Sequence, residues 1–208
     1  LGVGGVRPLV PVVLQAARAA CDATGALLIA DEVQCGLGRT GAWSACRQAG
    51  VVPDLVTLAK PLAAGLPLGA LLGRDDLADD LGPGSHGSTF GGGPLACRLA
   101  LAFLDAVEEE GLLAAVQERG RRLADGLRAI AADGGAGPIE AVRGRGLMVG
   151  VVLRRPAAGV VDALLARGIV AGTAGELVLR LLPPYVISDE EIDRFLDTLA
   201  SVLKGGGE

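Results

Sequence analysis

Two short apolar runs, each ending in a charged residue, constrain the fold of this chain more than any other feature. Residues 27–30 (LLIA) lead into Asp31, and residues 55–59 (LVTLA) lead into Lys60. Apolar runs of this length are typical of strands buried on both faces of a parallel α/β sheet. Ligands of such sheets bind at the carboxyl ends of the strands, so Asp31 and Lys60 are candidates for a functional site. An ordinary buried ion pair is the alternative.

The composition argues against several classes of function. The 208 residues are 50% hydrophobic and carry a net charge of -5 without a basic cluster, which argues against nucleic acid as a partner. No stretch forms the roughly 20-residue apolar span that a membrane helix needs. The four cysteines form no CxxC pair and His86 is the single histidine, so we expect no metal site. Free thiols in a reducing cytoplasm are the expected state of the cysteines.

Helical periodicity and turn residues divide the chain into two expected domains, 1–132 and 133–208. Residues 11–24 carry one apolar stripe at helical spacing and stop at Gly25. Residues 94–132 are predicted to be helical with a break near Gly111, and DGGAGP at 133–138 is the expected boundary. The second domain is predicted to be α/β, with strands at 140–153, 169–171 and 177–182, a helix near 157–167, and a helix at 189–203 that a capping box from Ser188 to Glu191 begins.

Two glycine-rich segments each allow two interpretations. Residues 36–41 match GxGxxG, but acidic residues precede the glycines and Asp54 opens the next strand instead of closing it. A tight turn is therefore favoured over a dinucleotide-binding loop. Residues 81–94 (LGPGSHGSTFGGGP) predict a loop that could wrap an anion with backbone N–H groups and the hydroxyls of Ser88 and Thr89. A plain linker is the alternative.

Five ordered motifs resemble those of the class-III aminotransferase family of pyridoxal-phosphate enzymes. They are DEVQCGLGRTG at 31–41, PDLVTLAKPLAAGLPLGA at 53–70, HGSTFGGGPLAC at 86–97, VRGRGLMVG at 142–150 and LVLRLLPPYVISDEEID at 177–193. The resemblance covers nearly the whole chain. It implies the α/β type I PLP-transferase fold, with part of the large-domain sheet and a small C-terminal domain. CGLGRTG, TLAKPLA and TAGELVLRLLPP are most similar to the acetylornithine branch of that family.

This resemblance implies pyridoxal 5'-phosphate (PLP) as the cofactor and a role for each site residue. Lys60 would hold the cofactor covalently and then move a proton, which needs an amine that burial beside cationic groups keeps neutral part of the time. Asp31 would keep the ring nitrogen protonated, Gln34 would hydrogen-bond the phenolic oxygen and Val33 would pack on the ring. The remaining implied contacts are those of Ser88 and Thr89 with the phosphate and of Arg180 with the substrate α-carboxylate.

The implied reaction moves an amino group from N-acetylornithine, or a related ω-amino compound, to 2-oxoglutarate in arginine biosynthesis. We expect a cytoplasmic protein, and the family implies a homodimer with a shared active site. LGVGGVRP at residues 1–8 resembles a loop, QGEGGV, near the middle of full-length members, so the chain looks like their second half. Val3 stands where the family has Glu, and Gly93 where it often has Asn. Two alternatives remain: an ω-amino-acid aminotransferase of other specificity, and a non-catalytic fragment or degenerate subunit that needs its missing half.

Overall fold

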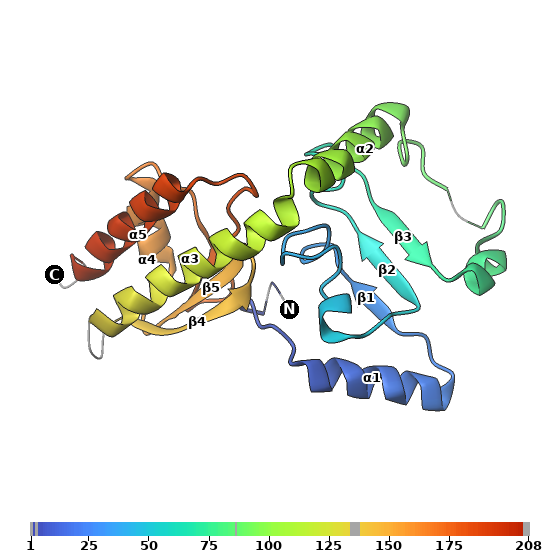
Figure 1. Cartoon of the computed structure of the whole chain (residues 1–208), viewed down its shortest axis with the longest axis horizontal. Coiled ribbons are helices and arrows are strands. Elements are labelled where there is room, and N and C mark those ends of the chain that lie inside the picture. Colours follow the sequence, from blue (N-terminus) through green and yellow to red (C-terminus); the bar gives the residue numbers. More distant parts are fainter. Residues whose placement is uncertain (1, 3, 86, 134–137, 206–208) are drawn as a thin grey trace. The chain divides into compact units, whose positions relative to one another are not determined.

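The computed structural model describes residues 2, 4–85, 87–133 and 138–205 and divides into two compact units (Figure 1). One unit is Leu9–Leu113; the other combines Leu1–Pro8 with Ala114–Glu208. The sequence places a domain boundary at 132/133, whereas these compact units separate at 113/114. Most of the long helix α3 (Leu112–Asp133) belongs to the second unit because it packs against the C-terminal sheet.

The Leu9–Leu113 unit is built on a three-stranded sheet in the order β1-β2-β3. Strands β1 and β2 are parallel, as the apolar runs predict, and Asp31 of β1 pairs in register with Thr57 of β2. Strand β3 is antiparallel to β2. The elements of this unit are α1 (Pro11–Thr24), β1 (Ile29–Asp31), the 3-10 helix η1 (Arg47–Ala49), β2 (Leu55–Leu58), β3 (Ala70–Gly73), the 3-10 helix η2 (Asp75–Leu81) and α2 (Pro94–Glu109).

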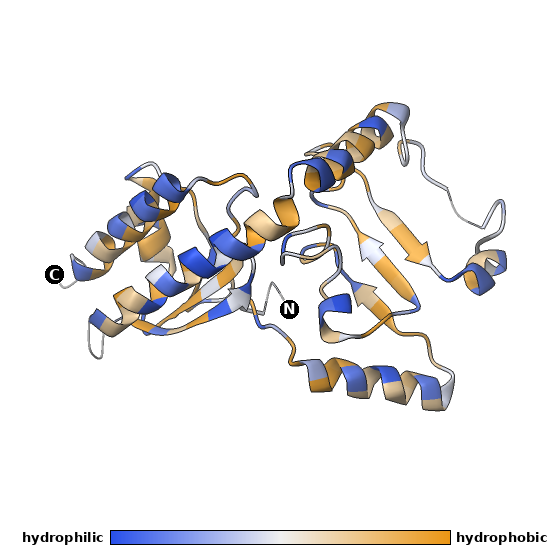
Figure 2. Ribbon diagram, in the orientation of Figure 1, coloured by the Kyte–Doolittle hydropathy of each residue, from blue (hydrophilic) through white to orange (hydrophobic). Residues whose placement is uncertain are grey.

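The expectation that both strands are buried on both faces is wrong for this chain. Ile29 in β1 is 58% exposed, and every residue of β2 is only half-buried. Figure 2 shows that these strands are nevertheless largely hydrophobic. One apolar cluster under α2 covers part of the sheet. That cluster consists of Leu37, Leu62 and Ala100 with Trp43, Leu58, Leu68, Ala70, Phe103 and Leu104 packed against it.

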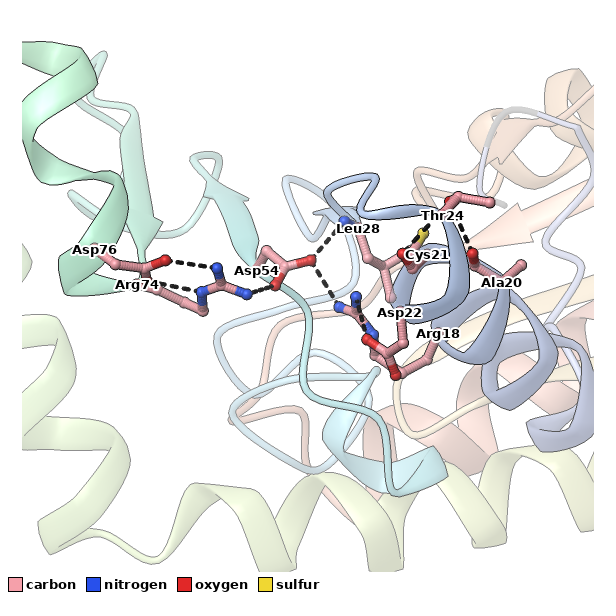
Figure 3. A network of polar contacts seen from close by, with 9 residues as sticks. All are labelled: Arg18, Ala20, Cys21, Asp22, Thr24, Leu28, Asp54, Arg74 and Asp76. Atoms are coloured by element: carbon pink, nitrogen blue, oxygen red, sulfur yellow. Dashed lines mark hydrogen bonds and ion pairs between the residues drawn. The ribbon is translucent and has the colours of Figure 1, made fainter.

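A buried carboxylate holds one edge of the three-stranded sheet together (Figure 3). Asp54 is 4% exposed and accepts hydrogen bonds from the Leu28 backbone N–H at 2.7 Å and from Arg18 of α1 at 2.7 Å. Arg74, directly after β3, forms an ion pair with the other Asp54 oxygen and a second one with Asp76 at 2.7 Å. One side chain therefore connects α1, the approach to β1, the start of β2 and the end of β3.

Replacing Asp54 with asparagine is expected to lower the thermal midpoint clearly, because the Arg18 and Arg74 guanidinium groups and the Leu28 N–H lose their charged acceptor. The Leu28 N–H bond and Arg18 hold the pKa of Asp54 below its ordinary value of 3.8. A lowered folded-state pKa stabilises the fold above that ordinary value, and this contribution is lost as the pH falls through the folded pKa. The stability difference between the two proteins should therefore be constant near neutral pH and shrink below about pH 4.

Chemical denaturation across pH 2.5–7 measures that difference. Asp22→Asn is the matched control, since Asp22 also pairs with Arg18 but its side chain is 65% exposed. A pH-independent difference for Asp54→Asn would contradict the ion-pair explanation.

The second unit contains an antiparallel sheet in the order β4-β5-β7-β6. The single strand expected at 140–153 is in fact two, because Gly146 takes a left-handed conformation (φ 54°) that reverses the chain. The strand expected at 169–171 lies instead at 172–173. The elements after α3 are β4 (Ile139–Arg145), β5 (Met148–Leu153), α4 (Ala158–Leu165), β6 (Gly172–Thr173), β7 (Val178–Leu181) and α5 (Asp189–Lys204).

The helices α4 and α5 of this unit begin close to their predicted starts. The capping box of α5 is confirmed: Ser188 Oγ accepts the Glu191 N–H at 3.2 Å, and Glu191 Oε2 accepts the Ser188 N–H at 2.8 Å. Helix α3 approaches the β4–β5 turn so closely that a methyl group at Gly120 would lie 2.4 Å from the Gly146 carbonyl oxygen. None of the described helices is long and apolar enough to cross a membrane.

Candidate active site

Asp31 and Lys60 follow neighbouring parallel strands, so the fold brings both to the same edge of the sheet. Asp31 ends β1, and Lys60 lies three residues beyond its register partner Thr57. One oxygen of Asp31, Oδ1, accepts hydrogen bonds from the Val33 N–H at 3.1 Å and from Thr57 Oγ1 at 3.3 Å. No described residue donates to the other oxygen, Oδ2. Asp31 is exposed, so this oxygen is available to a ligand.

Lys60 has an unusual backbone conformation. Its φ is +33°, in the left-handed region that non-glycine residues rarely occupy, and Ala64 in the same turn has φ +50°. The turn is held by hydrogen bonds such as Leu62 N–H to the Ala59 carbonyl at 2.9 Å. Strained residues of this kind concentrate at functional sites. The expectation of a buried amine is wrong here, since Lys60 lies in the surface turn after β2 and is exposed.

Glu32 lies between the candidate residues Asp31 and Gln34, and its importance was not predicted from the sequence. It is 2% exposed, and its carboxylate accepts hydrogen bonds from Ser44 Oγ at 2.7 Å and from the backbone N–H groups of Ala45 and Cys46, both at 2.9 Å. A charged residue at the end of an apolar run was the available signal. Glu32 thus closes the loop 35–46 back onto the end of β1.

The GxGxxG segment inside this loop is a turn, as predicted. Gly38 and Gly41 have φ of +97° and +85°, and Gly41 N–H bonds the Gly38 carbonyl at 2.8 Å. Burial, followed by the negative charge of Glu32, raises the pKa of Cys35 to about 12. Cys35 is therefore a protonated donor that points at Glu32 (3.6 Å) rather than a nucleophile. Groups of His, Cys, Asp and Glu suited to a metal ion are absent from the described part of the chain.

Replacing Glu32 with glutamine should open this loop without unfolding the unit. The amide NH₂ would face hydrogen-bond donors, and loss of a charged acceptor costs about 1.5–3 kcal/mol per bond. Trp43, the single tryptophan, is half-buried and its carbonyl accepts the Leu37 N–H at 2.9 Å, so its emission reports on the loop. We expect a red-shifted Trp43 emission for Glu32→Gln and none for Glu109→Gln, at the exposed end of α2. Identical spectra for wild type and Glu32→Gln would rule this role out.

Val33 and Gln34 follow Asp31 directly, and both are half-buried. Val33 contributes its N–H to Asp31, while the described residues form no hydrogen bond with the Gln34 side chain. The geometry therefore leaves the Gln34 amide free to bind a ligand beside the β1 end.

Ser88 and Thr89 lie in the loop before α2, and both are exposed. Ser88 Oγ accepts the Gly91 N–H at 3.0 Å, and Ser88 lines a groove of about 560 Å³ between residues 66–69 and 88–96. Gly93 is the N-cap of α2 and supplies no side-chain acceptor to the first turn. Its nearest neighbour would be 3.9 Å from an added methyl group, so a β-carbon fits at this position. Val3, the other departure, lies outside the described residues.

Arg180 belongs to the other unit. It is half-buried in β7, opposite Gly172 of β6. Its guanidinium lies over that glycine, with Nη2 3.8 Å from where a Cβ would be. No carboxylate or carbonyl of the described residues pairs with it. A half-buried guanidinium without a protein acceptor is suited to binding a carboxylate ligand.

The sequence of residues 1–203 matches the profile of the family described as aminotransferase class-III. The chain belongs to the class-III aminotransferase family. It is 47% identical over 203 residues to acetylornithine aminotransferase 1 of Bordetella pertussis, covering 98% of this chain and 51% of that protein. It is 45% identical over 198 residues to acetylornithine aminotransferase of Methanosarcina mazei, covering 95% and 49% respectively.

Solved class-III structures confirm the α/β type I fold expected from the motifs. Ornithine aminotransferase from Toxoplasma gondii ME49 matches with a TM-score of 0.91 at 37% identity, over 98% of this chain and 49% of that one. N-acetylornithine aminotransferase from Stenotrophomonas maltophilia K279a matches with a TM-score of 0.85 at 38% identity, over 98% and 54%. The chain thus spans about half the length of the relatives that it matches.

Proposed function

We propose that this chain forms part of a PLP-dependent aminotransferase that moves the amino group of N-acetylornithine to 2-oxoglutarate, in arginine biosynthesis. The observation that carries the proposal is the pair of parallel strand ends. Asp31, with one oxygen fixed by Thr57 and the other unbonded, lies at the same sheet edge as the strained Lys60. Membership of the class-III family and acetylornithine relatives at 45–47% identity support the substrate choice.

The residues at this edge fit PLP. When bound, PLP supplies the electron sink for the reaction. Asp31 Oδ2 would accept the ring N–H and favour the protonated ring, while Thr57 and Val33 hold the carboxylate in place. Gln34 would donate to the phenolic oxygen, and Val33 would cover one face of the ring. Lys60 would hold the cofactor. Its Nζ would take a proton from the donor carbon that carries the amino group, and would later give a proton to the carbon of the oxo acid that receives the amino group.

The remaining contacts concern the anionic groups. The hydroxyls of Ser88 and Thr89 would bind the phosphate, and Arg180 would form a bidentate pair with the substrate α-carboxylate.

We further propose a cytoplasmic homodimer with a shared active site. Exposed apolar residues beside the groove, Phe90 at 88% and Leu95 at 68%, favour a covering subunit, and the described cysteines are all free, as in a reducing compartment.

A comparison of amino donors tests the proposal. With 2-oxoglutarate as acceptor, N-acetylornithine should be used with higher kcat/KM than ornithine or 4-aminobutyrate. The structural match to an ornithine aminotransferase makes preference for ornithine the second candidate function. The assay should be run on the 208-residue chain alone and on the chain supplied with the remaining length of its relatives. We expect little turnover from the chain alone, as for a partial enzyme. An independent enzyme would transfer the amino group without the remaining length.

A further inference from the structure

A row of four residues crosses the C-terminal sheet at Arg180. Strand pairing sets Arg143 of β4 opposite Gly150 of β5, Gly150 opposite Arg180, and Arg180 opposite Gly172 of β6. Residues directly opposite each other in antiparallel strands point to the same face. Arg143 and Arg180 therefore share one face, two strand spacings or about 10 Å apart, with glycine between them.

The N-terminal segment 4–6 packs onto this face at the glycine. A methyl group at Gly150 would lie 2.8 Å from Val6 Cβ and 3.2 Å from Val178. Val6 is 2% exposed and so occupies the space that Gly150 leaves beside Arg180. The guanidinium of Arg180 lies on the other side, over Gly172. Val6 thus covers the sheet face over Gly150, the residue that pairs with Arg180 in the neighbouring strand.

Arg143 holds segment 4–6 in this place. Its Nε donates to the Gly5 carbonyl at 2.7 Å, and its Nη2 lies 2.6 Å from where a Gly5 Cβ would be, so a side chain at position 5 would have to displace this guanidinium. Gly5 and Val6 have φ of +98° and +50°, and both N–H groups bond the Gly2 carbonyl, at 3.2 and 3.0 Å. A left-handed conformation at a β-branched valine is unfavourable by itself and requires such external support.

We propose that Arg143 is a positioning residue for substrate carboxylate binding: it fixes segment 4–6 so that Val6 confines Arg180 in its binding conformation. The proposal rests on the role of Arg180 in the proposed function. A confined guanidinium loses less side-chain entropy when a carboxylate binds, and exclusion of water from its flank strengthens the pair. Arg143 itself need not touch the substrate.

The first experiment is amide hydrogen exchange on the 208-residue chain, which requires no cofactor or activity. Arg143→Ala should increase exchange at Gly5 and Val6 by at least about tenfold, since it releases the bond to Gly5, while β5 and β7 keep their protection. Arg154→Ala, an exposed arginine directly after β5, is the matched control and should change nothing. Unchanged exchange at Gly5 and Val6 in Arg143→Ala would overturn the proposal.

The second experiment measures steady-state kinetics of the active aminotransferase for Arg143→Ala, Val6→Ala and Arg180→Ala. Arg143→Ala and Val6→Ala should raise KM for 2-oxoglutarate about tenfold while kcat changes little. KM for an amine donor without an α-carboxylate should stay the same, whereas a merely structural defect would affect both substrates. If Arg180→Ala raises the 2-oxoglutarate KM and the other two variants do not, this inference is wrong and the proposed clamp stands. If Arg180→Ala has no effect either, the clamp in the proposed function is wrong as well.

Discussion

Lys60→Ala is expected to reduce amino-group transfer by at least about a thousandfold. Proton transfer by a positioned side chain contributes about 10²–10⁴-fold by itself, and loss of the covalent attachment point adds to this. Lys60→Arg should be as inactive, because a guanidinium does not give up its proton near neutral pH. An inactive Lys60→Arg variant would show that the reaction needs an amine that can lose its proton, and not only a positive charge at this position.

The matching chemical test uses borohydride to fix bound PLP onto the protein. Mass spectrometry of the peptides should place the adduct on Lys60. The only other lysine, Lys204 in α5, is exposed and bonds Asp133 at 3.2 Å, so Lys204→Ala is the control and should retain activity and labelling. An adduct on Lys204, or full activity of Lys60→Ala, would refute the assignment.

Arg180→Ala is expected to have the second largest effect. Removal of a charge-assisted carboxylate contact costs about 1.5–3 kcal/mol, which lowers kcat/KM about 10- to 150-fold. The loss should apply to substrates with an α-carboxylate and spare amines that lack one. Arg180→Lys should recover only part of it, because an ammonium cannot form the bidentate pair.

Kinetics with 2-oxoglutarate and with paired donors that differ in the α-carboxylate measure the effect. The exposed Arg154→Ala again provides the control for loss of one positive charge. Equal losses for substrates with and without the carboxylate would indicate misfolding rather than a lost clamp, and no loss for either would remove Arg180 from the site.

Local sequence signals accounted well for the helices and for the ends of the first two strands. Helix α1 ends directly before Gly25, which has φ +72°, as the position of this glycine after the apolar stripe predicts. The capping box at Ser188 and the break at Gly111 are likewise local, since both depend on residues a few positions apart. The β4–β5 hairpin was missed because a reversal at a single glycine leaves an apolar run that resembles one long strand.

The sequence by itself determined the family, the α/β class and the alignment of Asp31 and Lys60 at two strand ends, because these follow from short motifs and strand direction. Only the tertiary structure showed that Glu32 closes the loop 35–46, that Asp54 joins α1 to three strands, and that Val6 covers Gly150 beside Arg180. Those contacts connect residues 12 to 144 positions apart, and nothing in either local sequence specifies the partner. A buried carboxylate or a glycine in a strand signals that a partner exists, but the sheet register and the path of the chain decide which one it is.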